Sequence, residues 1–203
     1  LTRLVGSEMC IRDSTYTVQN LERLGVSAVV IEDKKGLKKN SLFGTDVKQE
    51  QDSIENFCEK IKVGINSKQT DEFMVIARIE SLILGKGIED ALLRGRSYAN
   101  SGANGVLIHS KDKSEELVFQ FVENFKKDFD VPVIVVPTTY NHITLDEFKK
   151  LGVDIVIYAN HLLRSAYPAM LNTAEEILKF GRTQELEKKL MSVKEVINFI
   201  PTD

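Results

Sequence analysis

The sequence predicts an α/β fold in which a parallel sheet forms part of a (β/α)8 barrel of the TIM type. Five short apolar runs alternate with segments of helical periodicity along the 203 residues. The runs are continuously apolar, as expected for strands that are buried on both faces of a parallel sheet. Three of the runs also follow a glycine turn and have similar sequences, GVSAVVI, GANGVLI and GVDIVI. Such quasi-repeats suit a barrel.

The strands are the clearest elements. Each is a short apolar run, rich in valine and isoleucine, bounded by turn residues or by charge. We expect them at Val26–Ile31, Phe73–Ile79, Gly105–Ile108, Val131–Val136 and Asp154–Tyr158.

The helices are predicted from apolar residues three and four positions apart. A first helix, starting near Thr15, ends at Gly25, because glycine favours the position after a helix. Asp52 and Ser53 are start signals for the second. The remaining helices are expected at Asp52–Val63, Gly87–Ser101, Glu115–Asp128, Leu145–Leu151, Leu162–Phe180 and near Gln184–Ile200, with Pro168 a kink or boundary in the penultimate one.

Two architectures fit this order of elements, an open doubly wound sheet and a barrel segment. No glycine-rich phosphate fingerprint follows a strand, which disfavours a dinucleotide-binding fold. A complete barrel needs about 250 residues. We therefore expect an incomplete barrel with about five C-terminal βα units, in which the first three strands are missing.

The domain division follows from the N-terminus. Residues 1–14 (LTRLVGSEMCIRDS) start without methionine and show no clean periodicity. We interpret Leu1–Ser14 as a non-native segment and Thr15–Asp203 as one partial barrel domain with C-terminal helices.

Composition excludes several classes of protein. A net charge of −3 and a pI near 5.8 argue against nucleic-acid or anionic-membrane partners. Cys10 and Cys58 form no ligand spacing and no disulfide framework, so a reducing, cytoplasmic compartment is the expectation. The apolar runs are strand-sized, and no secretory signal is evident.

Polar residues gather where the predicted strands end, which is where barrel enzymes keep their chemistry. Glu32 and Asp33 follow the first strand, and a lysine-rich loop comes next. The other strand ends supply Arg78, Glu80, His109, Ser110, Thr138, Thr139, Asn160 and His161. Carboxylates for a hard cation beside groups that bind anionic oxygens predict an anionic, phosphorylated small substrate held with Mg²⁺.

Each of these residues also has a purely structural interpretation. Glu32 and Asp33 could cap the next segment or pair with lysines, and a lysine run is usually a solvated loop. Arg78 is different, because an arginine inside the run FMVIARI needs an anionic partner in a largely buried setting. His142 and His161 are interpreted as structural or surface residues, and Cys58 as core.

Six segments carry a family resemblance: IEDK with K-x-N-S-L, ARIE, GANGVLIHSK, VIVVPTTY, VIYANHLLR and SVKEV. Together they resemble the phosphoenolpyruvate mutases of the isocitrate lyase superfamily, over roughly Thr15–Ile200. The resemblance implies a modified (β/α)8 barrel, Mg²⁺, and the interconversion of phosphoenolpyruvate and phosphonopyruvate in phosphonate biosynthesis. It also implies a homo-oligomer, dimer or tetramer, in which the last helix is exchanged between subunits.

The resemblance assigns roles to individual residues. Glu32 supports Mg²⁺ through water, and Lys38 and Asn40 belong to a gating loop, in which Asn40 contacts the transferring phosphoryl group. Arg78 and His109 bind the phosphoryl and carboxylate ends of the substrate, with Ser110 beside them. A loose phosphoryl-transfer transition state needs positioning and charge stabilisation, which these residue types supply.

The chain also departs from the family pattern. Lys35-Gly36-Leu37 stands where an aromatic residue and a proline usually precede the loop lysine. The Trp-Gly-Ser-type segment and the Asp-x-Asp pair that binds Mg²⁺ directly in the family have no counterpart. We therefore expect the chain to be inactive alone.

Three other functions remain open. The first two are a phosphonopyruvate hydrolase and a lyase that acts on a 2-methylisocitrate-like substrate. Lyases of the superfamily typically carry a loop cysteine that this chain lacks, and Lys38-x-Asn40 favours a mutase over a hydrolase. The third, from another class, is a barrel remnant without catalysis.

Overall fold

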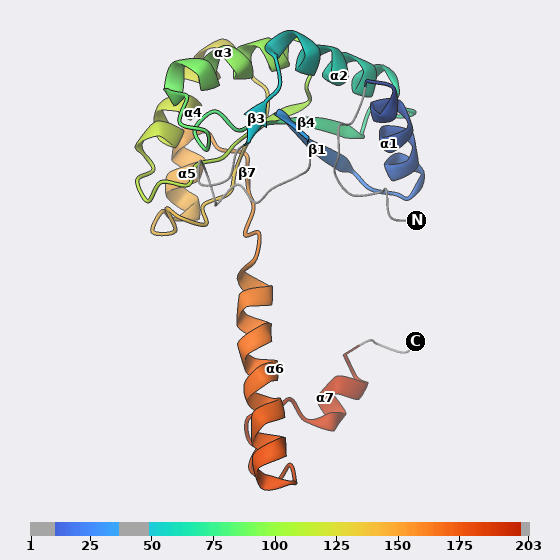
Figure 1. Ribbon diagram of the computed structural model, residues 1–203, viewed down its shortest axis with the longest axis vertical. Coiled ribbons are helices and arrows are strands. Elements are labelled where there is room, and N and C mark those ends of the chain that lie inside the picture. The colour runs from blue at the N-terminus through green and yellow to red at the C-terminus, as the bar shows by residue number, and fades with distance from the viewer. Residues whose placement is uncertain (1–10, 37–48, 200–203) are drawn as a thin grey trace. The chain divides into compact units, whose positions relative to one another are not determined.

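The structure is a computed structural model that describes residues 11–36 and 49–199 (Figure 1). It contains two compact units, residues 1–158 and 159–203, where the sequence predicted one domain from Thr15 onward. In the described ranges no helix is long and apolar enough to span a membrane.

A five-stranded parallel sheet forms the centre of the first unit. Its spatial order is β1-β4-β5-β6-β7, which is also the order of these strands along the chain. The strands are β1 (Ala28–Glu32), β4 (Met74–Ile79), β5 (Gly105–Ile108), β6 (Val133–Val135) and β7 (Ile155–Val156). All five lie where the sequence predicted strands, although β1 ends one residue later than expected and β6 and β7 are shorter.

Helix α1 (Ile11–Arg23) precedes β1, and α2 (Ile54–Asn66), α3 (Gly87–Asn100), α4 (Glu116–Asp128) and α5 (Leu145–Leu151) connect the strands of the sheet. Figure 1 shows α1 to α4 side by side in an arc along the sheet, and each contacts the next. Crossovers that follow one direction along the sheet place helices on one face, as in a barrel wall, whereas a doubly wound sheet has helices on both. The partial-barrel prediction therefore agrees with the observed arrangement.

The core has two parts, one on each face of the sheet. The larger part packs the helices onto the sheet through Phe57, Ile61, Phe121 and many other buried side chains. The smaller part consists of Ile76, Leu107, Ile134 and Val136, which lie on the opposite face. Cys58 is buried on α2, as predicted for a core residue.

Local signals fix several helix ends. Ser53 caps α2, since its side chain accepts a hydrogen bond from the Asn56 amide at 3.1 Å. Thr144 and Glu147 form a capping box at the start of α5, and Gly152 ends that helix with φ of +97°.

The N-terminal helix starts earlier than predicted. Helix α1 begins at Ile11, inside the segment that we interpreted as non-native, and Ser14 is buried. Residues 11–14 thus take part in the fold, whereas the origin of Leu1–Ser14 stays a prediction.

The sequence missed two short strands, β2 (Lys34–Lys35) and β3 (Glu50–Gln51), which pair antiparallel. They consist of polar residues and are two residues long, so they carry no hydrophobic pattern from which a strand could be predicted.

The second unit contains α6 (His161–Phe180) and α7 (Val193–Ile197). Helix α6 continues through Pro168, so the boundary, one of the two roles predicted for this proline, was wrong. The helix expected near Gln184–Ile200 is much shorter, because Ser192 and Glu195 form a capping box that starts α7 at Val193.

Candidate active site

The site is built by strand register at the carboxyl end of the sheet. Glu32, the last residue of β1, is the direct register partner of Arg78 on β4, and Arg78 is in turn the partner of Leu107 on β5. Side chains of register partners in parallel strands point to the same face, and every second residue returns to it. Glu32, Arg78 and, two residues beyond Leu107, His109 therefore share the face that α1 to α4 do not cover.

Arg78 is the centre of this cluster. Its Nε donates to Glu80 Oε1 at 2.6 Å, its NH1 lies 3.3 Å from Glu32 Oε1, and its NH2 lies 3.0 Å from His109 Nδ1. The prediction that a buried arginine requires an anionic partner is confirmed, with two carboxylates beside it.

His109 is a neutral imidazole at neutral pH. Burial, together with the positive charge of Arg78, lowers the pKa of His109 to about 4. A guanidinium nitrogen can donate but cannot accept, so His109 Nδ1 accepts from Arg78 and the ring proton is on Nε2. The Nε2–H group is thereby a hydrogen-bond donor for an oxygen atom of a ligand.

Lys34 adds a second cation to the cluster. Its Nζ lies 3.0 Å from Glu80 Oε2 and 3.5 Å from Glu32 Oε2, and it donates to Gln49 Oε1 at 2.9 Å. Two carboxylates, two cations and a neutral histidine thus stand together at the carboxyl edge of the sheet. Arg78 and Lys34 are cations of the kind that form charge-assisted hydrogen bonds with anionic oxygens.

Asp33 points to the opposite face from Glu32, under α3. Its fully buried carboxylate accepts from Tyr98 Oη at 2.7 Å, Gln51 Nε2 at 2.8 Å and Arg94 NH1 at 3.3 Å. Burial raises the pKa of Asp33, and these donors oppose that shift. Of the two adjacent carboxylates, Glu32 faces the Arg78 cluster, and Asp33 joins the end of β1 to β3 and α3.

Ser110 occupies a different position from His109. It is buried, and its hydroxyl accepts a hydrogen bond from the Asp112 amide at 3.1 Å, while its carbonyl accepts from Thr139 Oγ1 at 3.2 Å. The hydroxyl thus stabilises the loop after β5, and the structure does not bring it to Arg78. The predicted gating residues Lys38 and Asn40 lie outside the described residues.

Asp33 and Glu80 were named at the predicted strand ends, but neither they nor Lys34 received a role in the site. The position of Glu80 beside Arg78 could have been predicted from the segment ARIE, because a residue two positions after Arg78 returns to the same side of the strand. The separate environments of Glu32 and Asp33 follow from the same alternation.

A metal site cannot be assembled from the described residues alone. In residues 11–36 and 49–199, no three His, Cys, Asp or Glu side chains gather closely enough to hold a metal ion. Glu32 faces this edge but is already paired with Arg78 and Lys34. The donor set falls short of the several oxygen ligands that Mg²⁺ requires.

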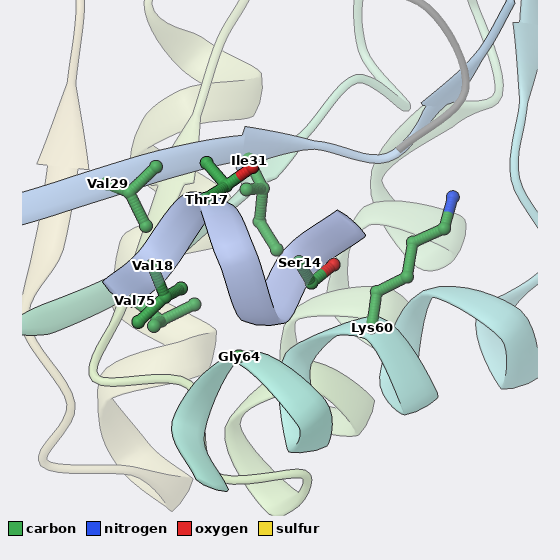
Figure 2. A pocket seen from close by; sticks show the side chains of 8 residues that line it. All are labelled: Ser14, Thr17, Val18, Val29, Ile31, Lys60, Gly64 and Val75. Carbon is green, nitrogen blue, oxygen red and sulfur yellow. The ribbon is translucent and has the colours of Figure 1, made fainter. Parts of the chain in front are cut away.

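A small pocket lies on the other face of the sheet, between α1, α2 and β1 (Figure 2). Val18, Val29, Ile31 and Val75 line it, and the Lys60 amine points away from the apolar walls in Figure 2 and pairs with Asp52 at 2.8 Å. The pocket is a packing gap under α1 and does not belong to the Arg78 cluster.

The sequence of this chain is similar to those of known enzymes. The profile of the phosphoenolpyruvate phosphomutase family matches residues 7–178. A phosphoenolpyruvate phosphomutase from Tetrahymena pyriformis is 40% identical over 179 residues, which are 88% of this chain and 59% of that protein.

Two solved structures are similar in fold. A phosphoenolpyruvate phosphomutase from Streptomyces platensis subsp. rosaceus matches with a TM-score of 0.88 at 39% identity, over 95% of this chain and 65% of that one. A phosphonopyruvate hydrolase in complex with oxalate and Mg²⁺ matches with a TM-score of 0.84 at 34% identity, over 96% and 65%.

The matches fix the family and the extent of the likeness. This chain spans 59% to 65% of the length of these relatives, in keeping with part of a TIM-type barrel. The match of the family profile to most of the chain, over the strands that carry Glu32, Arg78 and His109, shows that the chain belongs to the phosphoenolpyruvate phosphomutase family.

Proposed function

We propose that the protein containing this chain interconverts phosphoenolpyruvate and phosphonopyruvate. The observation that carries the proposal is the contact between Arg78 NH2 and His109 Nδ1 at 3.0 Å, at the carboxyl ends of adjacent parallel strands in a member of this family. A guanidinium next to a neutral imidazole donor suits a small molecule with two anionic ends.

The residues of the chain would act by binding and orientation. Arg78 supplies a planar, permanently charged fork for phosphoryl or carboxylate oxygens, and His109 donates from Nε2 without adding charge. Ser110 supports the loop that follows His109. Lys38 and Asn40 keep their proposed roles in the loop that excludes water and contacts the phosphoryl group, from the sequence resemblance alone.

We propose Mg²⁺ as the cation, with Glu32 contacting it through water. Support comes from the similar hydrolase structure, which contains Mg²⁺ with oxalate. Because the described residues do not form a metal site, direct ligands would have to come from other residues. For the same reason we propose that the reaction requires more than the residues described, and that this chain alone does not turn over substrate.

Phosphorus NMR tests the reaction directly. Phosphonopyruvate and MgCl₂ are added to a protein that combines this chain with the remaining length of its relatives, and to the 203-residue chain itself. Phosphoenolpyruvate should form with the longer protein and not with the chain.

Substitutions in the longer protein test the site residues. Arg78→Gln alters the site, and Arg96→Gln is its matched control at a surface arginine. Asn40→Ala should abolish turnover while ligand binding stays measurable. Turnover by Asn40→Ala at the wild-type rate would contradict the loop assignment.

A phosphonopyruvate hydrolase is the second candidate, since such an enzyme is 34% identical with a TM-score of 0.84. The same experiment distinguishes it, because hydrolysis yields inorganic phosphate and pyruvate. Cleavage of 2-methylisocitrate would indicate a lyase. No change in any of these substrates, with ligand binding intact, would indicate a non-catalytic remnant.

We also propose a homo-oligomer, a dimer or tetramer, with an exchanged C-terminal helix, in a cytoplasmic protein. Helix α6 supports the association, because it has no buried residue and carries exposed Leu162, Leu163, Tyr167, Met170 and Leu171. Light scattering on the chain should give a multiple of 22.9 kDa, and Leu171→Glu should reduce it. A monomeric mass at high protein concentration would contradict this.

A further inference from the structure

Glu80 is a fully buried carboxylate at the end of β4 that the proposed function leaves without a role. It stands two residues after Arg78 and beside both cations of the cluster. A buried carboxylate is costly unless it is paired, so its retention in this place needs a reason.

Contacts from both cations and from Asp33 hold Glu80 in place. Oε1 accepts from Arg78 Nε at 2.6 Å, and Oε2 lies 3.0 Å from Lys34 Nζ. The backbone N–H of Glu80 donates to Asp33 Oδ1 at 3.0 Å. The carboxylate is therefore held by Lys34 of β2 and by Arg78 of its own strand, while Asp33 holds its backbone, and it cannot move without breaking a buried interaction.

Because Glu80 is fixed, it determines the orientation of the Arg78 guanidinium. A guanidinium is planar, so a hydrogen bond from Nε to a fixed carboxylate sets the direction of the other two nitrogens. With Nε on Glu80, NH1 faces Glu32 and NH2 faces His109. We infer that Glu80 is a positioning residue, which holds the guanidinium of Arg78 in the orientation that receives an anionic ligand. The ligand part of this inference rests on the proposed function.

Position and charge can be separated by two substitutions. Glu80→Asp keeps the charge but withdraws the carboxylate by one methylene, whereas Glu80→Gln keeps an acceptor oxygen in place and removes the charge. If Glu80 acts through position, Glu80→Asp is the more harmful change for ligand binding. If it acts through charge alone, Glu80→Asp is harmless.

Oxalate is the probe for ligand binding, measured by calorimetry on the full 203-residue chain. We expect Glu80→Asp to weaken oxalate binding roughly tenfold, the equivalent of one charge-assisted hydrogen bond. Glu80→Gln should bind oxalate at least as tightly as the wild type, since a negative charge near the anion is gone. Wild-type affinity in Glu80→Asp, or a larger loss in Glu80→Gln than in Glu80→Asp, would overturn the inference.

The Nε–H resonance of Arg78 in nitrogen-15 NMR gives a second reading that needs no ligand. The peak is assigned by its absence in Arg78→Lys, and it should move upfield in both Glu80 variants as the short bond to Oε1 weakens. Asp128→Asn is the matched control, because Asp128 accepts from Arg96 Nε at 2.8 Å on the surface; it should shift the Arg96 peak and leave that of Arg78 in place.

The oxalate affinity and the Arg78 resonance together separate the positioning role of Glu80 from the binding of an anionic ligand. An unmoved Arg78 resonance in a folded Glu80 variant would refute the positioning role, whether or not oxalate binds. If Glu80→Asp does not fold, the Glu80→Gln resonance decides in the same way. Absence of oxalate binding by the wild type, with the Arg78 peak still moving, would count against the ligand part of the inference while supporting the positioning of Arg78.

Discussion

At the residue scale, the contact between Arg78 and His109 sets the protonation state of the histidine. A cation 3.0 Å from Nδ1 and a buried setting both penalise a second ring proton. An imidazole kept neutral in this way can donate to a ligand over a wide pH range.

The lowered pKa makes stability depend on pH in a defined window. Above pH 6.5, the ordinary pKa, His109 is neutral in both the folded and the unfolded chain, so it adds no pH dependence. As pH falls from 6.5 towards about 4, the unfolded chain binds a proton that the folded chain does not, and the free energy of unfolding decreases. The slope from this group approaches about 1.4 kcal/mol per pH unit.

Urea unfolding at pH 7, 5.5 and 4.5 measures this dependence. His109→Gln should flatten the decrease between pH 6.5 and 4 relative to the wild type, because the substituted side chain does not titrate. The control His142→Gln, at an exposed histidine, should leave the decrease in place. Parallel losses of stability in the wild type and His109→Gln would contradict the assignment.

At the element scale, Asp33 connects three parts of the first unit. Its side chain joins the end of β1 to Gln51 on β3 and to Arg94 and Tyr98 on α3. Arg94 also donates to the Asp52 carbonyl at 2.9 Å and to Asp90 at 3.0 Å. The short β2–β3 ladder and the strand that carries Glu32 are thus tied to the same helix.

Removing the Asp33 charge should therefore destabilise the first unit. Asp33→Asn leaves the buried Arg94 without one of its carboxylates and places an amide donor against other donors, at a cost of about 3 kcal/mol. Chemical denaturation measures the loss, and Glu59→Gln, in an exposed pair with Lys62, serves as a control with little expected change. A stability of Asp33→Asn equal to that of the control would show that the network is not needed.

Two helical glycines offer a matched test of packing. A Cβ on Gly95 of α3 would lie 3.0 Å from Phe121 Cζ of α4, whereas one on Gly64 of α2 would meet Val75 at an ordinary 3.6 Å. Gly95→Ala should lower the free energy of unfolding by about 1–3 kcal/mol through overpacking. Gly64→Ala should be neutral or slightly stabilising, because alanine favours the helix. Thermal unfolding compares them, and equal effects would mean that Phe121 moves aside freely.

The elements that sequence could predict are those whose signal is a hydrophobic pattern. The five parallel strands and α2 to α5 are long or apolar enough to show one, and Arg78 was identified because a charge interrupted such a run. The strands β2 and β3 and the short α7 depend on cross-strand pairing and on a capping box instead. Glu80 was named at a strand end without a role of its own. Its spacing to Arg78 places it beside that residue, but its contacts with Lys34 and Asp33 are long-range and appear only in the structure.

At the scale of the whole molecule, the core belongs to the first unit. Both core clusters are made of residues between 18 and 157, and α6 contributes none to them in the described part of the chain. The fold that carries Arg78 and His109 should therefore not depend on the second unit.

A chain that ends at Tyr158 tests this independence. We expect it to keep a cooperative unfolding transition and the neutral state of His109, because no residue of the clusters is removed. Circular dichroism and the imidazole resonances of His109 are the measurements. A non-cooperative transition in the shortened chain would show that the C-terminal helices are required for folding.

The strand order has a consequence for local opening. In the described sheet β1 and β7 each have one neighbouring strand, whereas β4, β5 and β6 have two. Amide hydrogen exchange should therefore be slowest in the three inner strands and faster in β1 and β7, since edge strands can open without disrupting the rest. Arg78 and the residues before His109 lie on slow-exchanging strands, while Glu32 lies on a faster one. The anion-binding pair would keep its geometry during openings that release the carboxylate opposite it.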